Sequence, residues 1–411
     1  MKTFLLSCAL ALCLAGCGGG GSGGSSSSSS TSSAATPASS TGVVTQSSNT
    51  VPFTVDATYG AVNGAYVNVT ICAVGTTTCT TIDHVQVDSG SVGLRILASA
   101  LPTGFAQPVV SDPTTGEQLA ECGEFGSGYT WGPLSKYDVT LGGETAHNLP
   151  VQIINDSFAT VPSACSSLGS SMGASGTASL FAKGIVGLGV GREDCGSGCA
   201  SAATDVYWVC PGTTCTESKL ATTSQVSNPI LGFPIDNNGM LLTLPTIASS
   251  GSAAVTGTLT FGINTQSNNQ RASATLLTTD DSGNFNVVLN GTSTQGFIDS
   301  GSSVYFFVDS SLGTCSLGGA NWYCPTSVTQ LSATLTGLTT GTLATTFSVG
   351  NAQTLLSNGH VAFNDVGVNE TVFSSAVLDL GLPYFFGKSV FFGIADADTS
   401  TASGSPYVAV Q

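Results

Sequence analysis

Two short segments of the sequence each place an aspartate between an apolar run and a Ser-Gly-Ser turn. Residues 85–91 read VQVDSGS and residues 296–302 read GFIDSGS, so Asp88 and Asp299 occupy the same place in two copies. Two carboxyl groups held close enough to share one proton cannot both ionise, because like charges at that range repel. Such a pair can take a proton from a water molecule and donate one to a carbonyl oxygen. The repeat therefore makes Asp88 and Asp299 candidates for a pair of carboxyl groups that activates water.

The residues around each aspartate are suited to support it. Gly90 and Gly301 allow tight turns and a close approach of the two loops. Ser91 and Ser302 are placed to hydrogen-bond the outer carboxylate oxygens and fix their orientation. A third Asp-Ser-Gly, at residues 281–283, has polar neighbours on both sides and predicts a hairpin turn instead. A preceding apolar strand therefore distinguishes the two candidate loops from this turn.

Strands must position both aspartates, because the chain is rich in strand formers and poor in helix formers. Of 411 residues, 52 are Gly and only 8% are charged, and short runs rich in Val, Ile, Thr and Phe alternate with Gly, Asn and Ser turns. Helical periodicity is confined to short pieces such as residues 303–312. The two aspartates lie 211 residues apart, which is long enough for one lobe each. The sequence therefore predicts an all-β fold with two related lobes.

The charge of the chain excludes several classes of partner. Eight Lys and Arg residues stand against 24 Asp and Glu residues, which gives a formal net charge of −16. Such an acidic chain offers no cationic surface for nucleic-acid phosphates or for anionic lipids. After the first 16 residues, no apolar run approaches the ~18 residues that span a bilayer. We therefore expect no nucleic-acid partner, and contact with a membrane only through a lipid anchor.

The N-terminus has the pattern of an export signal. A lysine precedes a short apolar stretch, and Leu-Ala-Gly-Cys at residues 14–17 resembles the bacterial lipobox. That resemblance implies a signal peptide at residues 1–16 and lipidation of Cys17, with Gly18 favouring the outer membrane of the cell envelope, facing either the periplasm or the surface. The alternative is an ordinary secretory signal with an incidental cysteine. Residues 17–50, rich in Gly, Ser and Thr, are expected to form a lipid-anchored tether.

The cysteine count agrees with export to an oxidising compartment. Of 13 cysteines, two leave with the signal and one takes lipid, which leaves ten, an even number, for disulfides. Connectivity does not follow from sequence alone, but spacing favours the pairs Cys72/Cys79, Cys195/Cys199, Cys210/Cys215 and Cys315/Cys324, which leaves Cys122/Cys165. A zinc site at residues 195–215 is the alternative for that cluster. Its spacing and the lack of a nearby histidine favour disulfides.

The two aspartate loops resemble the catalytic loops of the pepsin-like aspartic peptidases, which read apolar-apolar-Asp-[Ser/Thr]-Gly-[Ser/Thr] once in each lobe. The resemblance continues in order along most of residues 53–411. Residues 125–128 (FGSG) resemble the flap, and residues 137–143 resemble its return strand. Residues 184–189 and 380–392 resemble the apolar-Gly segments of the two halves, and residues 257–264 resemble an early C-lobe strand. The family implies a bilobal acid-protease fold of two related β-barrel-like lobes with a cleft between them. The N-terminal lobe would span residues 51–228 and the C-terminal lobe residues 229–411.

The same resemblance implies roles for further residues. Ser89 and Ser300 stand where the family's hydroxyl groups hydrogen-bond across the lobe interface. Gly187 and Gly381 would let the apolar-Gly segments pass close beneath the two loops. The flap over the substrate cleft is assigned to Phe125, Gly126, Ser127 and Tyr129.

Two positions depart from the family pattern. The flap position usually held by tyrosine is Phe125, which lacks the hydroxyl, although Tyr129 is near enough to substitute. Arg95 replaces the tryptophan that usually follows the first motif. Its side chain is expected either at an outward strand position or in contact with a carboxylate of the substrate.

These features predict a membrane-anchored, extracytoplasmic aspartic endopeptidase. Its partner would be a peptide or protein substrate, it would act as a monomer, and it would need neither a metal nor another cofactor. The alternative keeps the fold and drops the activity: a catalytically inactive lipoprotein that binds peptides or glycans, since a fold does not determine function. Retention of both aspartates with their flanking Ser and Gly residues favours the enzyme. The three histidines are scattered, without the spacing of metal ligands or of a serine-hydrolase triad.

Overall fold

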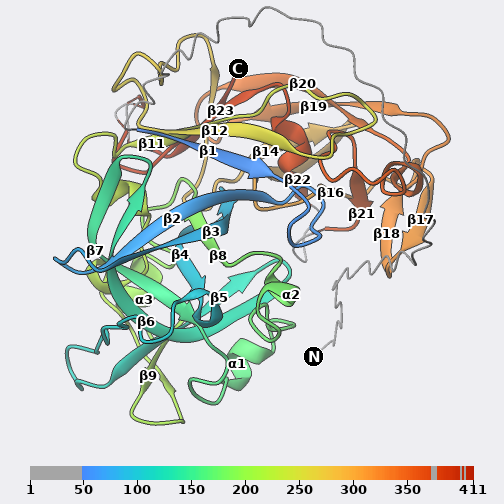
Figure 1. Cartoon of the computed structure of the whole chain (residues 1–411). Coiled ribbons are helices and arrows are strands. Elements are labelled where there is room, and N and C mark those ends of the chain that lie inside the picture. Colours follow the sequence, from blue (N-terminus) through green and yellow to red (C-terminus); the bar gives the residue numbers. More distant parts are fainter. Residues whose placement is uncertain (1–48, 372–376, 399, 402–403) are drawn as a thin grey trace, which may run out of the picture.

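The computed structural model describes residues 49–371, 377–398, 400–401 and 404–411, and within them most of the regular secondary structure is β-strand (Figure 1). In the first half they are β1 (Thr50–Val55), β2 (Ala65–Ala73), β3 (Cys79–Asp88), β4 (Val92–Leu97), β5 (Gln118–Phe125), β6 (Gly128–Leu141), β7 (Glu144–Ile154), β8 (Gly184–Leu188), β9 (Tyr207–Cys210) and β10 (Thr216–Glu217). In the second half they are β11 (Gly239–Thr243), β12 (Val255–Phe261), β13 (Thr275–Thr278), β14 (Phe285–Leu289), β15 (Thr292–Ile298), β16 (Tyr305–Phe307), β17 (Thr314–Leu317), β18 (Ala320–Tyr323), β19 (Thr329–Thr336), β20 (Thr342–Val349), β21 (Gly367–Asn369), β22 (Val377–Leu380), β23 (Ser389–Gly393) and β24 (Tyr407–Val410).

The helices of the described residues are short. They are α1 (Ser163–Ser166), α2 (Thr177–Leu180), α3 (Ser197–Ser201) and α4 (Ala352–Leu355), with 3₁₀ turns η1 (Ala98–Ala100), η2 (Thr222–Ser224), η3 (Pro229–Gly232) and η4 (Leu382–Phe385). None of these helices is long and apolar enough to cross a bilayer. The predicted signal peptide, Cys17 and all but the end of the predicted tether lie outside the described residues.

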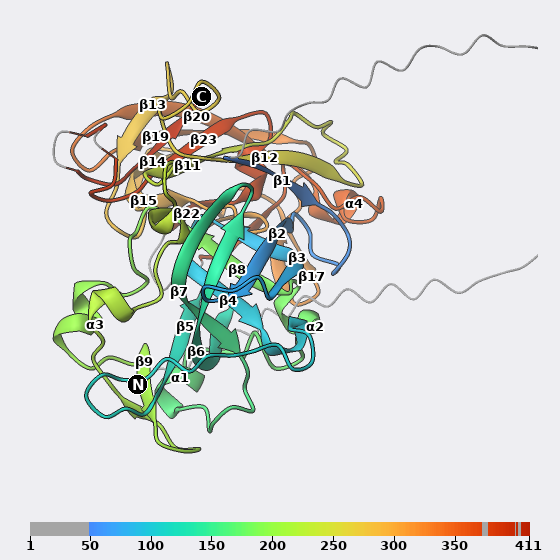
Figure 2. The same cartoon turned by 60° about the vertical axis from the view of Figure 1, so that its left-hand side comes forward.

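Six strands of the first half close into a barrel (Figure 2). Around the ring their order is β2-β3-β8-β4-β7-β6, and β6 pairs with β2 to complete it. The pairs β3–β8 and β4–β7 are parallel, and the other pairs are antiparallel. Every residue of β4 and β8 is buried, as expected for central strands that are covered on both faces. The first aspartate loop joins β3 to β4, which is one of these two fully buried strands.

The second half repeats this arrangement as an open half-barrel. Its nine strands have the order β17-β18-β21-β16-β22-β15-β14-β19-β20. Pairs β15–β22 and β16–β21 are parallel, like β3–β8 and β4–β7 of the barrel. Pairs β14–β15, β14–β19 and β16–β22 are antiparallel, like β2–β3, β2–β6 and β4–β8. The duplication predicted from the two aspartate loops is therefore present in the order and direction of the paired strands.

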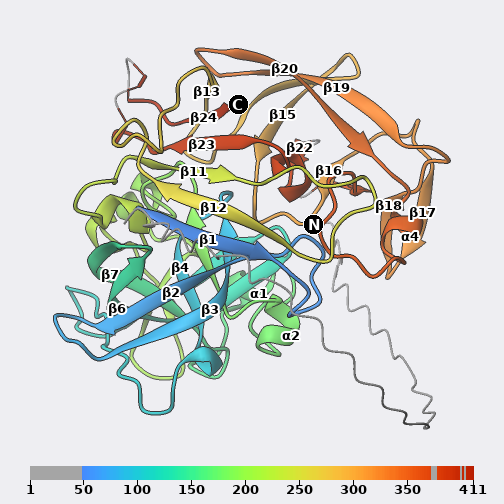
Figure 3. The same cartoon turned by 45° about the horizontal axis from the view of Figure 1, so that its top comes forward.

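The N-terminal strand joins the two halves. Strand β1 pairs with β2 of the barrel on one side and, over all six of its residues, with β12 of the second half on the other (Figure 3). The barrel strands and β1 thus belong to one fifteen-stranded sheet, which continues in the second half through β12, β11, β23, β24 and β13. One hydrophobic cluster contains residues of both halves, including Val87, Leu94, Phe261 and Leu380. The two lobes share a sheet and a core, and the lobe boundary at residues 228/229 stays a prediction.

The structure differs from the sequence-based expectation at two local points. Residues 303–312 contain no helix; they hold strand β16, whose Tyr305 pairs with Leu380. Sheet pairing overrides a weak local preference there, and aromatic residues favour strands. Residues 281–283 do lie at a turn, where the Gly283 amide donates to the Asp280 carbonyl. It is not a hairpin, because β13 and β14 belong to different sheets.

All ten cysteines of the described residues form disulfides. The pairs are Cys72–Cys79, Cys122–Cys165, Cys195–Cys199, Cys210–Cys215 and Cys315–Cys324. Four of them are the pairs that spacing favoured, Cys122–Cys165 is the pair that was left, and the cluster at residues 195–215 is two disulfides.

Candidate active site

Asp88 and Asp299 lie where two buried strands end. Asp88 is the last residue of β3, and Asp299 directly follows β15. Each of these strands lies inside its sheet, between β2 and β8 or between β14 and β22. Asp88 is 7% exposed and Asp299 is 8% exposed, so both carboxyl groups are nearly buried but still meet solvent.

The two loops are joined by a reciprocal set of hydrogen bonds. The Ser89 amide donates to Ser300 Oγ at 3.1 Å, and the Ser300 amide donates to Ser89 Oγ at 2.9 Å. Each hydroxyl then donates across the interface, Ser300 Oγ to the Val87 carbonyl at 2.9 Å and Ser89 Oγ to the Ile298 carbonyl at 3.4 Å. The loops are therefore fixed to each other by buried backbone and hydroxyl groups.

Each carboxylate is oriented by two donors from its own loop. The Gly90 amide donates to Asp88 Oδ1 at 2.8 Å, and the Gly301 amide donates to Asp299 Oδ1 at 2.7 Å. The outer oxygens accept from hydroxyl groups, Asp88 Oδ2 from Ser91 at 2.6 Å and Asp299 Oδ2 from Ser302 at 2.9 Å. The two loops thus provide matching sets of donors.

The glycines bring the carboxyl groups together across the interface. A Cβ atom on Gly90 would lie 2.7 Å from Asp299 Cγ, and one on Gly301 would lie 2.6 Å from Asp88 Cγ. Any side chain at either position would therefore displace the opposite carboxyl group. Space, rather than an unusual backbone angle, requires glycine here, since neither residue has a positive φ.

The surroundings of Asp299 disfavour its ionised form. Burial raises the pKa of Asp299 well above its usual range, and the charge of Asp88 and a hydrogen bond between the two carboxyl groups raise it further. The Gly301 amide and the Ser302 hydroxyl oppose this rise, because they stabilise the ionised form. Asp299 therefore favours its protonated form beside Asp88.

Close strand packing supports both loops from below. A Cβ atom on Gly187 would lie 2.5 Å from the Val92 amide nitrogen, and one on Gly381 would lie 2.2 Å from the Val304 carbonyl oxygen. These glycines let β8 and the end of β22 pass directly beneath the loops, as predicted. Gln86 adds a contact that the sequence reasoning missed, because its Nε2 donates to the Gly301 carbonyl at 2.8 Å.

A third buried carboxyl group, Asp379, was also missed. It lies on β22, is fully buried, and its Oδ2 is 2.6 Å from Ser302 Oγ. The sequence carried a signal for it. When Gly381 is aligned with Gly187, Asp379 falls opposite Ile185, an isolated acid in an apolar strand.

The predicted flap is the hairpin of β5 and β6, with Gly126 and Ser127 at its turn. Phe125 pairs with Gly128 at the end of the hairpin. Tyr129 is 7% exposed and packs with Trp131, and its backbone exchanges hydrogen bonds with the segment at residues 170–172. That these residues cover a bound substrate stays a prediction.

Arg95 is buried, which corrects both expectations for it. It is 3% exposed, it pairs with Glu121 of β5 and with Asp194 at 3.3 Å, and its guanidinium lies 5.5 Å from the centre of the Phe125 ring. Burial and the charge of Glu121 raise the pKa of Asp194 well above its usual range. Arg95 therefore fastens the hairpin strand β5 to β4 rather than facing outward or reaching substrate.

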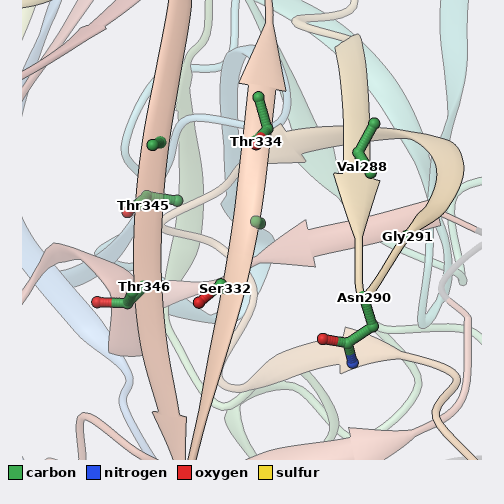
Figure 4. Close-up of a pocket in the computed structure, with 9 residues that line it drawn as sticks. Val288, Asn290, Gly291, Ser332, Thr334, Thr345 and Thr346 are labelled. Carbon is green, nitrogen blue, oxygen red and sulfur yellow. The ribbon is translucent and has the colours of Figure 1, made fainter.

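The structure also has a hollow of about 460 Å³ on the sheet of the second half (Figure 4). It is lined by side chains of β19 and β20 and by the turn between β14 and β15, among them Ser332, Thr334 and Asn290. None of the residues around the two aspartates lines it. The aspartate pair is therefore the candidate active site.

The chain resembles known proteins in two ways. A crystal structure of an aspartic proteinase from Irpex lacteus has a similar fold, with a TM-score of 0.50 and 16% sequence identity over 88% of this chain and 97% of that chain. No match was found among curated proteins. A family model described as "Protein of unknown function (DUF3443)" matches residues 45–410. The fold is thus the bilobal, all-β fold of the pepsin-like aspartic proteinases, and the chain belongs to the DUF3443 family.

Proposed function

We propose that this protein is an aspartic endopeptidase that hydrolyses peptide bonds with Asp88 and Asp299. The observation that carries the proposal is the matching arrangement of the two carboxyl groups. Each accepts hydrogen bonds from a backbone amide and a hydroxyl of its own loop, and each packs against the glycine of the other loop. The fold shared with an aspartic proteinase agrees with it.

The reaction uses a water molecule bound between the carboxyl groups. The ionised carboxylate takes a proton from this water while the protonated carboxyl donates its proton to the oxygen of the scissile carbonyl. The resulting tetrahedral diol collapses as its C–N bond breaks: the pair gives its proton to the leaving amine, and one hydroxyl of the diol returns its proton to the pair as the new carbonyl forms. One water is consumed, an acid and an amine are formed, and the pair recovers its single proton.

The environment of the proposed enzyme is the bacterial cell envelope. We infer that lipid on Cys17 holds the folded lobes at the outer membrane through the tether. The five disulfides agree with an oxidising compartment. Incorporation of labelled palmitate tests the anchor: wild-type protein should take up label and Cys17→Ser should not. Equal labelling of the two, or no labelling of either, would refute lipidation at this cysteine.

The peptidase is tested with purified protein and an unfolded protein substrate between pH 3 and pH 7. We expect cleavage by the wild type and none by Asp88→Asn or Asp299→Asn, since either change removes one member of the pair. A statine-type peptide, which mimics the tetrahedral intermediate, should inhibit. Cleavage that survives both substitutions would refute the pair. No cleavage at any pH, together with saturable binding of a peptide or glycan, would identify the protein as the binding module instead.

A further inference from the structure

Asp379 makes the candidate site asymmetric. In the first half, Gln86 pairs with Ile185 two residues before the aspartate, and in the second half Phe297 pairs with Asp379 at the equivalent position. Ile185 and Asp379 are both buried, so the fold places an apolar side chain beneath one loop and a carboxyl group beneath the other. The duplicated fold therefore does not itself require an acid at this position.

The Ser302 hydroxyl contacts the carboxyl groups of both Asp299 and Asp379. Ser302 Oγ lies 2.9 Å from Asp299 Oδ2 and 2.6 Å from Asp379 Oδ2. A serine hydroxyl has one proton, so it can donate to only one of these oxygens and must accept from the other. One of the two carboxyl groups is therefore protonated whenever both contacts are made.

The surroundings of Asp379 favour the proton on that residue. Its Oδ1 has no hydrogen-bond partner among the described residues, which disfavours a charge at this depth. Strands β15 and β16 flank β22 and carry no charged side chain, and the Tyr305 hydroxyl of β16 contacts the Asn364 carbonyl instead. Burial raises the pKa of Asp379 well above its usual range, and the charges of Asp299 and Asp88 raise it further.

We propose that Asp379 is a positioning residue that stores a second proton and supplies it to Asp299 through the Ser302 hydroxyl. The proton on Asp379 Oδ2 moves to Ser302 Oγ while the Ser302 proton moves to Asp299 Oδ2. Only O–H bonds form and break, and the cluster keeps its charge. When the pair loses its shared proton to solvent at higher pH, this transfer restores the singly protonated pair. The inference rests on the proposed peptidase function, and its effect is to extend activity toward neutral pH.

The pH profile of kcat/KM separates this role from a structural one. Asp379→Asn keeps the size of the side chain and can still donate to Ser302, but it has no proton to transfer. Asp379→Ile restores the apolar residue of the first half. We expect both substitutions to move the alkaline limb of the profile to lower pH by one unit or more, with little change at the acidic end. Asp365→Asn, which removes another buried carboxyl group, is the matched control and should leave the limb in place. A profile of Asp379→Asn that overlays the wild type would overturn the proposal.

An infrared measurement tests the stored proton without relying on activity. The spectrum of the wild type minus that of Asp379→Asn at pH 7 should contain the C=O stretch of one protonated carboxyl group. A difference spectrum with only carboxylate bands would overturn the proposal, because the proton would then be absent. If the wild type proves to have no peptidase activity, the proposed function fails, and the infrared result still decides whether Asp379 holds the proton.

Discussion

Ser300→Ala should loosen the junction between the two aspartate loops. The hydroxyl is fully buried, accepts from the Ser89 amide at 3.1 Å and donates to the Val87 carbonyl at 2.9 Å. Loss of a partner by a buried polar group costs about 1–3 kcal/mol, so two such losses predict a decrease of about 2–6 kcal/mol in the free energy of unfolding. Ser89→Ala should cost less, because the Ser89 hydroxyl makes a longer bond, 3.4 Å, to the Ile298 carbonyl.

Urea unfolding followed by fluorescence measures these free energies, and peptide cleavage measures the effect on the pair. We expect the rate of cleavage by Ser300→Ala to fall by roughly ten- to a hundredfold, since misplacement of catalytic groups by about 1 Å costs that much. Ser300→Thr keeps the hydroxyl and should recover most of both losses, and Ser316→Ala, at an exposed serine, should change neither. If Ser300→Ala stays within about 0.5 kcal/mol of the wild type, or if Ser89→Ala proves the more damaging, the reasoning from these hydrogen bonds is wrong.

Three further substitutions test other parts of the structure. Arg95→Met leaves the buried acids Glu121 and Asp194 without their cation and should lower the free energy of unfolding in urea by about 3–5 kcal/mol. Neutralising both acids as well should recover most of this loss, and no recovery would contradict the ion-pair account. Removing the Cys122–Cys165 disulfide, which spans 43 residues, should lower the free energy of unfolding by about 4 kcal/mol, and a change below about 1 kcal/mol would argue against the chain-entropy estimate. Burial raises the pKa of Asp365 to about 6, so its contribution to stability is complete below about pH 4 and is lost as the pH rises through 6. Asp365→Asn should therefore gain stability relative to the wild type between pH 4 and pH 7 by roughly 1–2 kcal/mol, and a constant difference across that range would contradict the assignment.

The position of β1 between the barrel and the second half has a consequence for how the lobes stay together. Strand β1 lies between β2 and β12 and pairs with β12 over all six of its residues, so it is held more extensively by the second half than by the barrel. Asn49 adds to this junction, since its Nδ2 donates to the Phe261 carbonyl at 2.9 Å. The lipid tether predicted from the sequence would thus attach directly to the strand that joins the two lobes.

Local sequence determined the features that repeat or that lie close together along the chain. The apolar-Asp-Ser-Gly-Ser pattern appears twice and marks Asp88 and Asp299, because each copy follows an apolar strand and continues into a tight turn. Four of the five disulfides join cysteines no more than nine residues apart, so spacing alone favoured them. The scarcity of helix formers likewise determined the fold class.

Tertiary structure alone decided which distant groups meet. Arg95 appeared to be an exposed cation because its partners Glu121 and Asp194 lie 26 and 99 residues further along the chain. Asp379 was an isolated acid in an apolar strand until the parallel pairing of β22 with β15 placed it 2.6 Å from Ser302. A single charged residue carries no periodicity, and its role depends on strand register and on burial, which the whole fold sets. Sequence therefore identified the two aspartates of the candidate site, and only the folded chain brought Asp379 to Ser302 and Arg95 to the β5 hairpin strand.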